Sequence, residues 1–140
     1  MEATLVRLGN EDGNHIFLEL QEEYSLSSRK SHQARVSLVE FVIGKFGGSV
    51  KAIIGLADLH KLLENCMYLY ENLTGHFFFL DAANEIFEFE LSGDGLGHIK
   101  VSGHIYDSPG SPSKLDFSFA IDQTQLKVVA DDLRKALATQ

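Results

Sequence analysis

The sequence has one cysteine, few basic residues and no long apolar run. Because Cys66 is alone, no disulfide bond can form within the chain, which fits a reducing compartment. No segment approaches the roughly 18 consecutive apolar residues that a membrane-spanning helix needs. The first residues include early acidic side chains and lack the apolar stretch of a secretory signal. We therefore expect a soluble, cytoplasmic protein with no membrane partner.

The shortage of basic residues bears on the kind of partner. The chain has 12 Lys and Arg against 20 Asp and Glu, for a net charge of −8. A surface that binds DNA or RNA must replace counterions with Lys and Arg, so this balance argues against a nucleic-acid partner. An acidic surface favours a basic protein partner, although acidity also serves solubility alone.

Length and patterning predict one α+β domain over residues 1–140. Polar segments at 21–33, 45–48 and 81–84 are expected to connect or turn the chain. Composition and the alternation of apolar and polar residues predict short strands at 4–9, 15–20, 34–44, 49–54, 85–91, 98–106 and 114–121. The apolar run at 76–80 predicts a further, buried strand.

Two segments have the spacing of amphipathic helices. The first, 56–73, has an apolar stripe of Leu56, Leu59, Leu63, Cys66, Tyr70 and Leu73, with Lys61, Asn65, Tyr68 and Asn72 opposite. The second, 124–138, follows Asp122 and Gln125, which have the spacing of a capping box. Its apolar stripe is Leu126, Val129, Ala130, Leu133 and Leu137. We expect an antiparallel sheet with both helices packed on one face, as a two-layer domain.

The segment ELSGDGLGHIKVSGH, at residues 90–104, combines alternating glycines with two histidines. A dinucleotide-binding loop needs a helix after the glycines, and a Walker loop needs a following Lys and Ser or Thr. Neither is present, so the glycines predict a hairpin turn. His98 and His104 lie six residues apart on one strand, roughly 20 Å, too far to share a metal ion.

Other chemical candidates are weak. His60 and Glu64 have the i, i+4 spacing that suits one ion, but two ligands do not specify a site. Cys66 lies within an apolar stripe and is expected to be a core residue. We expect no catalytic residue, no metal and no cofactor. The alternatives are a metal-assisted hydrolase that uses His60, Glu64 and an unidentified third ligand, and a small oligomeric scaffold.

The C-terminal segment KLDFSFAIDQTQLKVVADDLRKAL, with the preceding helix and strands, resembles the WapI-like family of small bacterial immunity proteins. The resemblance covers residues 36–137. It implies a non-enzymatic protein that neutralises a polymorphic toxin by direct binding. The residues that carry it are apolar: Leu59, Leu63, Phe87, Phe89, Leu115, Phe117, Phe119, Ile121, Leu126, Ala130 and Leu133.

If the resemblance extends to function, the polar face of the sheet is the expected binding surface. The expected partner is a basic toxin domain, for example one that acts on RNA or DNA. Alternation alone also explains why these residues face water, and the sequence leaves the oligomeric state open. The predicted partner-binding residues place acids around one aromatic anchor: Glu88, Glu90, His104, Tyr106 and Asp116.

Overall fold

The chain folds into eight strands and two helices, as seen in a computed structural model that describes residues 4–25, 33–81 and 85–138. In chain order these elements are β1 (Thr4–Gly9), β2 (His15–Ser25), β3 (Gln33–Ile43), β4 (Phe46–Gly55), α1 (Leu56–Asn72), β5 (Thr74–Leu80), β6 (Phe87–Asp94), β7 (His98–Tyr106), β8 (Lys114–Asp122) and α2 (Gln123–Ala138). All strand pairs are antiparallel, so the predicted α+β class is confirmed.

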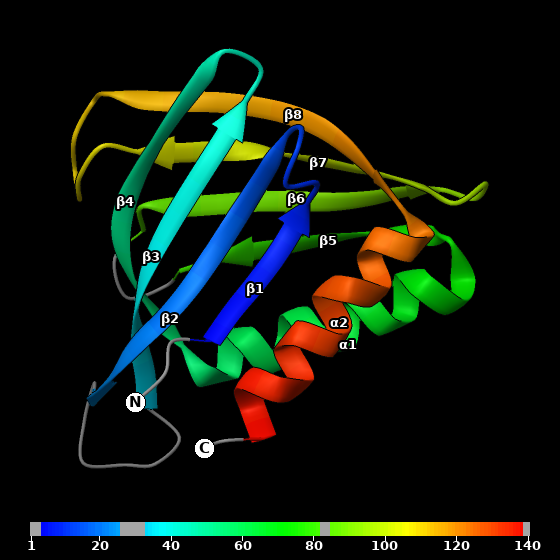
Figure 1. Cartoon of the computed structure of the whole chain (residues 1–140), viewed down its shortest axis with the longest axis horizontal. Coiled ribbons are helices and arrows are strands. Elements are labelled where there is room, and N and C mark those ends of the chain that lie inside the picture. Colours follow the sequence, from blue (N-terminus) through cyan, green and yellow to red (C-terminus); the bar gives the residue numbers. More distant parts are fainter. Residues whose placement is uncertain (1–3, 26–32, 82–84, 139–140) are drawn as a thin grey trace.

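The strands divide into two four-stranded sheets, whereas alternation alone suggested a single sheet. Strands β1 to β4 form one sheet in chain order, and β5 to β8 form the other. Helix α1 separates the two sets, because it carries the chain away from β4 before β5 begins. Figure 1 shows the strands of one sheet crossing those of the other, with the helices together at one side.

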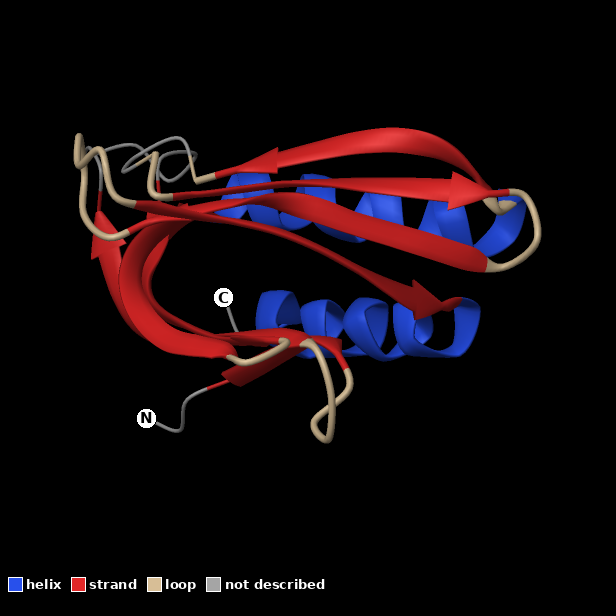
Figure 2. Cartoon of the chain, turned by 90° about the horizontal axis from the view of Figure 1, so that it is seen from above, coloured by secondary structure: helices blue, strands red, loops and turns tan. Residues whose placement is uncertain are grey.

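The two helices pack beside β1 and β5, the first strand of each sheet. Helix α2 packs along β1, α1 packs beside β5, and the helices pack on each other. Viewed from above, each helix therefore accompanies one sheet (Figure 2). Arg7 on β1 fixes the packing of α2 through a two-pronged ion pair with the buried Asp132 on α2, with N–O distances of 2.9 and 3.0 Å. The backbone N–H of Arg7 donates to the same carboxylate.

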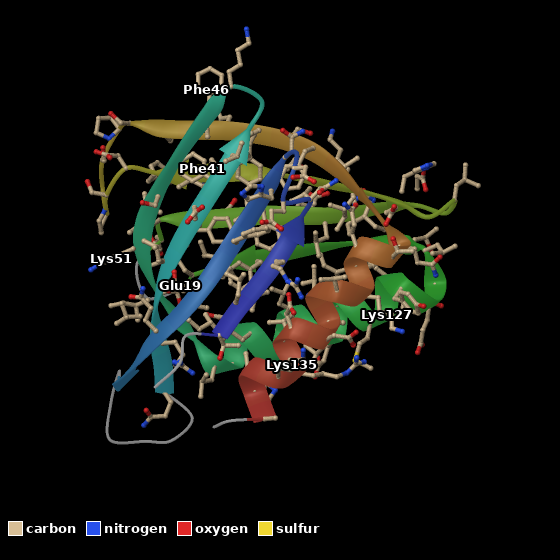
Figure 3. All side chains as sticks on the ribbon, viewed as in Figure 1. Glu19, Phe41, Phe46, Lys51, Lys127 and Lys135 are labelled. Carbon is tan, nitrogen blue, oxygen red and sulfur yellow. The ribbon has the colours of Figure 1, made fainter. Side chains whose placement is uncertain are left out.

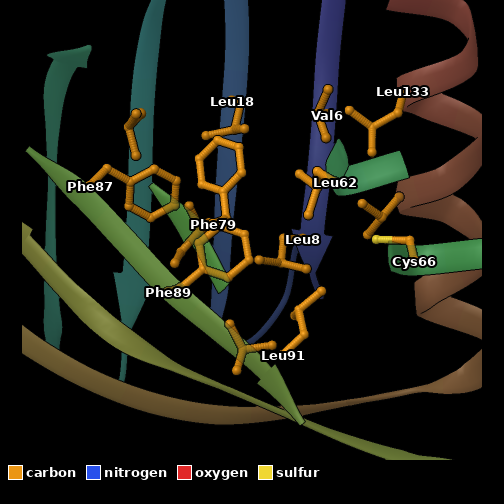
Figure 4. Close-up of a cluster of buried hydrophobic side chains, with 14 of the residues drawn as sticks. Val6, Leu8, Leu18, Leu62, Cys66, Phe79, Phe87, Phe89, Leu91 and Leu133 are labelled. Atoms are coloured by element: carbon orange, nitrogen blue, oxygen red, sulfur yellow. The ribbon is translucent and has the colours of Figure 1, made fainter. Parts of the chain in front are cut away.

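One hydrophobic core receives side chains from both sheets and both helices. Phe79, Phe87 and Phe89 pack with ring centroids 5.1–5.8 Å apart at its centre. Figure 4 shows these rings facing Leu8 and Leu18 of the first sheet. The apolar sides of the two sheets thus cover each other, which is why each strand shows only one buried face.

Helix α2 begins as the sequence predicts. The backbone N–H of Gln125 donates to the Asp122 side chain, and the backbone N–H of Asp122 donates to the Gln125 side chain, both at 2.9 Å. This is a reciprocal capping box. All predicted core residues of α2 are buried except Leu137, which is partly buried against the core.

The predicted stripe on α1 is partly wrong. Asn65, expected on the solvent side, is only 9% exposed, while Tyr70, expected in the core, is 37% exposed. Leu62 and Leu69 are buried instead. The buried face is rotated around the helix because α1 contacts both α2 and the second sheet.

Two predicted connections are shorter than expected. Residues 21–25 continue β2 and pair with β3 after a bulge between Leu20 and Glu23. The buried Arg35 holds this bulge by donating to the carbonyls of Leu20 and Gln21. The rest of that predicted connection, residues 26–32, lies outside the described residues.

The predicted turn at 45–48 is also displaced. The chain turns at residues 44–45, and β4 already begins at Phe46. Phe46 projects from the tip of this β3–β4 hairpin (Figure 3).

The orientation of α2 predicts that two substitutions lower the free energy of unfolding by unequal amounts. Leu133 is fully buried, and its replacement by alanine leaves a cavity that should lower the free energy of unfolding by about 2–5 kcal/mol. Val128 is 38% exposed on the same helix, so Val128→Ala should cost under about 1 kcal/mol. Urea denaturation measures both, and equal losses would contradict this orientation.

Candidate functional site

The outer face of the β5–β8 sheet brings the predicted partner-binding residues together. Strand register places Glu88 opposite His104, and His104 opposite Asp116, in one row across β6, β7 and β8. Glu90 lies two residues along β6, and Tyr106 two residues along β7. Their gathering on one face is a geometric finding, and their role in binding stays a prediction.

Two apolar side chains that were not among the predicted binding residues, Phe78 and Leu80, also lie on this face. They lie opposite Glu90 and Glu88 on β5 and are 69% and 37% exposed. The apolar run at 76–80 predicts a buried strand, but of its three phenylalanines only Phe79, the last, is buried. The two-residue period of a strand could have predicted this exposure: if Phe79 faces the core, Phe78 and Leu80 must face outward. Exposed aromatic residues are enriched at protein interfaces relative to the rest of the surface.

Several acids on this sheet are paired within it. Glu90 accepts a hydrogen bond from His76 at 3.0 Å, and Asp116 lies 3.7 Å from the ammonium of Lys114. Exposed pairs of this kind contribute little stability, typically under about 1 kcal/mol. The rings of His104 and Tyr106 meet edge to face, with centroids 5.1 Å apart.

A hollow of about 620 Å³ opens beside these two rings. It receives residues from the end of β5, the start of β6, the outer face of β7 and the loop after β7. Its lining consists of Leu80, Glu85, Glu88, His104, Tyr106, Pro109, Gly110 and Ser111. Three of the five predicted binding residues therefore line it.

The fully buried Asp81 shapes the β5–β6 side of this hollow. Its carboxylate accepts the backbone N–H groups of Phe87 at 2.9 Å and Ile86 at 3.2 Å. Its carbonyl accepts the N–H of Glu85 at 2.8 Å, and Glu85 has a φ of 55°. Burial raises the pKa of Asp81 to about 6, although the two backbone donors act in the opposite direction. The sequence placed Asp81 in a simple turn at 81–84, of which residues 82–84 lie outside the described residues.

The glycine segment is a hairpin, as predicted. It joins β6 to β7, with φ of 85° at Gly95 and 97° at Gly97. The Asp94 carboxylate accepts the backbone N–H of Leu96, and this bond lowers the pKa of Asp94. Gly93 lacks a side chain because a β-carbon there would collide with the carbonyl oxygen of Leu73. The segment therefore fits tightly over the end of α1.

The remaining chemical candidates stay apart from the hollow. His60 and Glu64 are exposed on α1, and His98 pairs with Asp94 at 2.9 Å. Cys66 is buried, and burial raises the pKa of its thiol to about 12. Within the described ranges, no three His, Cys, Asp or Glu side chains come together to hold a metal ion. In the same part of the chain, no helix is both long and apolar enough to cross a membrane.

The buried Asp81 predicts a specific pH dependence of stability. Its pKa is higher in the folded protein, about 6, than its ordinary value of 3.8, so its stabilising effect is complete below about pH 3.8 and is lost as the pH rises through 6. The stability of the wild type relative to Asp81→Asn should therefore fall across this window, by roughly 3 kcal/mol at most.

Urea denaturation of both proteins from pH 3.5 to 7 measures this difference. Asp116→Asn, at an exposed position of the same sheet, controls for the loss of one carboxylate. A difference between wild type and Asp81→Asn that rises with pH would contradict the assignment.

Comparison with known proteins identifies the family. A family model described as the immunity protein WapI-like family matches residues 7–139. No curated protein and no solved structure matches the chain. The matched region runs from β1 to α2 and includes the whole outer face of the β5–β8 sheet. The chain belongs to the WapI-like family of immunity proteins.

Proposed function

We propose that this protein neutralises a basic toxin domain by binding it with the outer face of the β5–β8 sheet, without chemistry of its own. Membership of an immunity protein family supports a protein-binding role. The observation that carries the choice of surface is the single row of Glu88, His104 and Asp116, flanked by the exposed Phe78 and Leu80.

The composition of this face suits a protein partner. Interfaces combine apolar and aromatic anchors with a polar surround, and their binding energy is concentrated in a few anchors. Phe78 and Tyr106 supply aromatic surface on β5 and β7, and the acids surround them. The strands hold all of these side chains in fixed register, so little order has to be gained on binding.

Electrostatics favours a basic toxin. A toxin that acts on RNA or DNA needs a positive surface, and an acidic inhibitor with a net charge of −8 complements it. Attraction between the two surfaces speeds their encounter, and salt weakens that effect. A cytoplasmic toxin target fits a chain whose one cysteine is a buried thiol.

Charge reversal on β6 tests the proposed face. Glu88→Lys together with Glu90→Lys should slow association with the cognate toxin by about tenfold or more at low ionic strength, since the steering charges are reversed. The effect should shrink as salt is added. Stopped-flow association kinetics with the cognate toxin domain measures it.

A matched variant separates local from overall charge. Glu64→Lys with Glu71→Lys makes the same change in net charge on the exposed side of α1. It should leave most of the association rate intact. Equal slowing by both double variants, or unchanged binding by the β6 variant, would contradict the proposed face. Unchanged thermal melting of each variant confirms that the fold is retained.

A further inference from the structure

The hollow beside Tyr106 contains two carboxylates, those of Glu85 and Glu88, that have no basic partner among the described residues. Glu90, Asp94 and Asp116 on the same sheet pair with His76, His98 and Lys114. Glu85 and Glu88, by contrast, make no side-chain hydrogen bond or ion pair within the part of the chain that the structure describes. Their negative charge is therefore available to a cation from outside.

Glu85 occupies its place at a conformational cost. Its φ of 55° lies in the left-handed region, which is uncommon for residues other than glycine. The hydrogen bond from its N–H to the carbonyl of Asp81 supports this conformation, and Asp81 is in turn bound to Ile86 and Phe87. Residues kept in such conformations gather at functional sites. The strained backbone conformation at Glu85 thus places a carboxylate at the hollow.

The remaining lining suits a planar cation on an aliphatic stem. His104 and Tyr106 supply two aromatic rings that meet edge to face, with centroids 5.1 Å apart. Leu80 supplies aliphatic surface. A guanidinium group stacks on aromatic rings and binds carboxylates through two parallel hydrogen bonds, whereas an ammonium group is a compact, strongly hydrated charge. The hollow's volume of about 620 Å³ is ample for one long side chain.

The neighbouring lysine does not fill this position. Lys114 lies opposite Tyr106 in the β7–β8 register, but it pairs with Asp116 and is not part of the lining. Among the described residues that line the hollow, His104 is the one with a side chain able to carry positive charge. A basic side chain from another molecule would therefore meet both carboxylates without displacing an internal partner.

From these contacts we propose that the hollow is a socket for one arginine side chain of the toxin, with Glu85 and Glu88 binding the guanidinium and Tyr106 stacking on it. This inference rests on the proposed function, and it specifies the chemistry of the partner's anchor. It gives each residue a separate part in binding: Glu88 contributes charge, and the uncharged Tyr106 contributes a stacking surface.

The socket can be tested without the toxin. The full-length protein, labelled with ¹⁵N and ¹³C, is titrated with N-acetyl-L-arginine amide and followed by NMR. Saturable shifts are expected at Glu85, Glu88 and Tyr106, with none from N-acetyl-L-citrulline amide, a neutral molecule of similar shape. N-acetyl-L-lysine amide should bind at least about threefold more weakly, because it cannot stack or form the paired hydrogen bonds.

Variants assign the binding to the socket. Glu88→Gln should weaken arginine amide binding about threefold or more, and Tyr106→Leu should do the same, while Tyr106→Phe should retain most of it because the ring remains. Glu40→Gln removes the same charge from an exposed position on β3 and should change nothing. Each variant's thermal melt confirms that it is folded.

Three results would overturn the socket: no saturable shift at millimolar arginine amide, equal binding of the citrulline or lysine probe, or equal loss in Glu40→Gln. Failure of the socket is distinguishable from failure of the proposed function. Toxin binding that depends on the β6 acids, without arginine amide binding, would contradict the socket alone. Arginine amide binding in the socket, without any effect of the β6 acids on toxin association, would contradict the proposed function.

Discussion

The two-residue period of a β-strand, applied to β6, β7 and β8, fixes both the core and the outer face of this protein. Phe87, Phe89, Phe117 and Phe119 must enter the core, since burying each large apolar side chain contributes about 1.5–3 kcal/mol. The residues between them are then forced outward. A register slip of one residue would bury the acids and expose the rings, so the hydrophobic core itself holds the acidic row in place.

Buried polar side chains join segments whose arrangement the strand period alone does not set. Arg35 ties the bulge in β2, Asp132 ties β1 to α2, and Asp81 ties the end of β5 to the start of β6. Each compensates for its burial by hydrogen bonds to backbone or to an opposite charge. Asp81 differs in its consequence, because the backbone that it fixes positions Glu85 at the hollow. Core architecture and candidate site are thus connected through one carboxyl group.

Local patterns in the sequence predicted local structure well. Alternation located the strands, the Asp122–Gln125 spacing predicted the helix start, and the glycines without a following helix predicted a hairpin. What could not be predicted depends on distant contacts. The division into two sheets follows from the path of α1, and the burial of Asn65 follows from α1 packing on two neighbours. Phe78 and Asp81 were missed because their exposure and burial are set by strands that follow them in the chain.

The structure of the complex between this protein and the toxin domain proposed as its partner tests the central claim most directly. The account predicts that the toxin covers the outer face of the β5–β8 sheet, with a basic side chain beside Glu88 and Tyr106 and with Phe78 buried in the interface. A toxin bound instead to the outer face of the β1–β4 sheet or to the exposed sides of α1 and α2, with Glu88 and Tyr106 left in solvent, would contradict it.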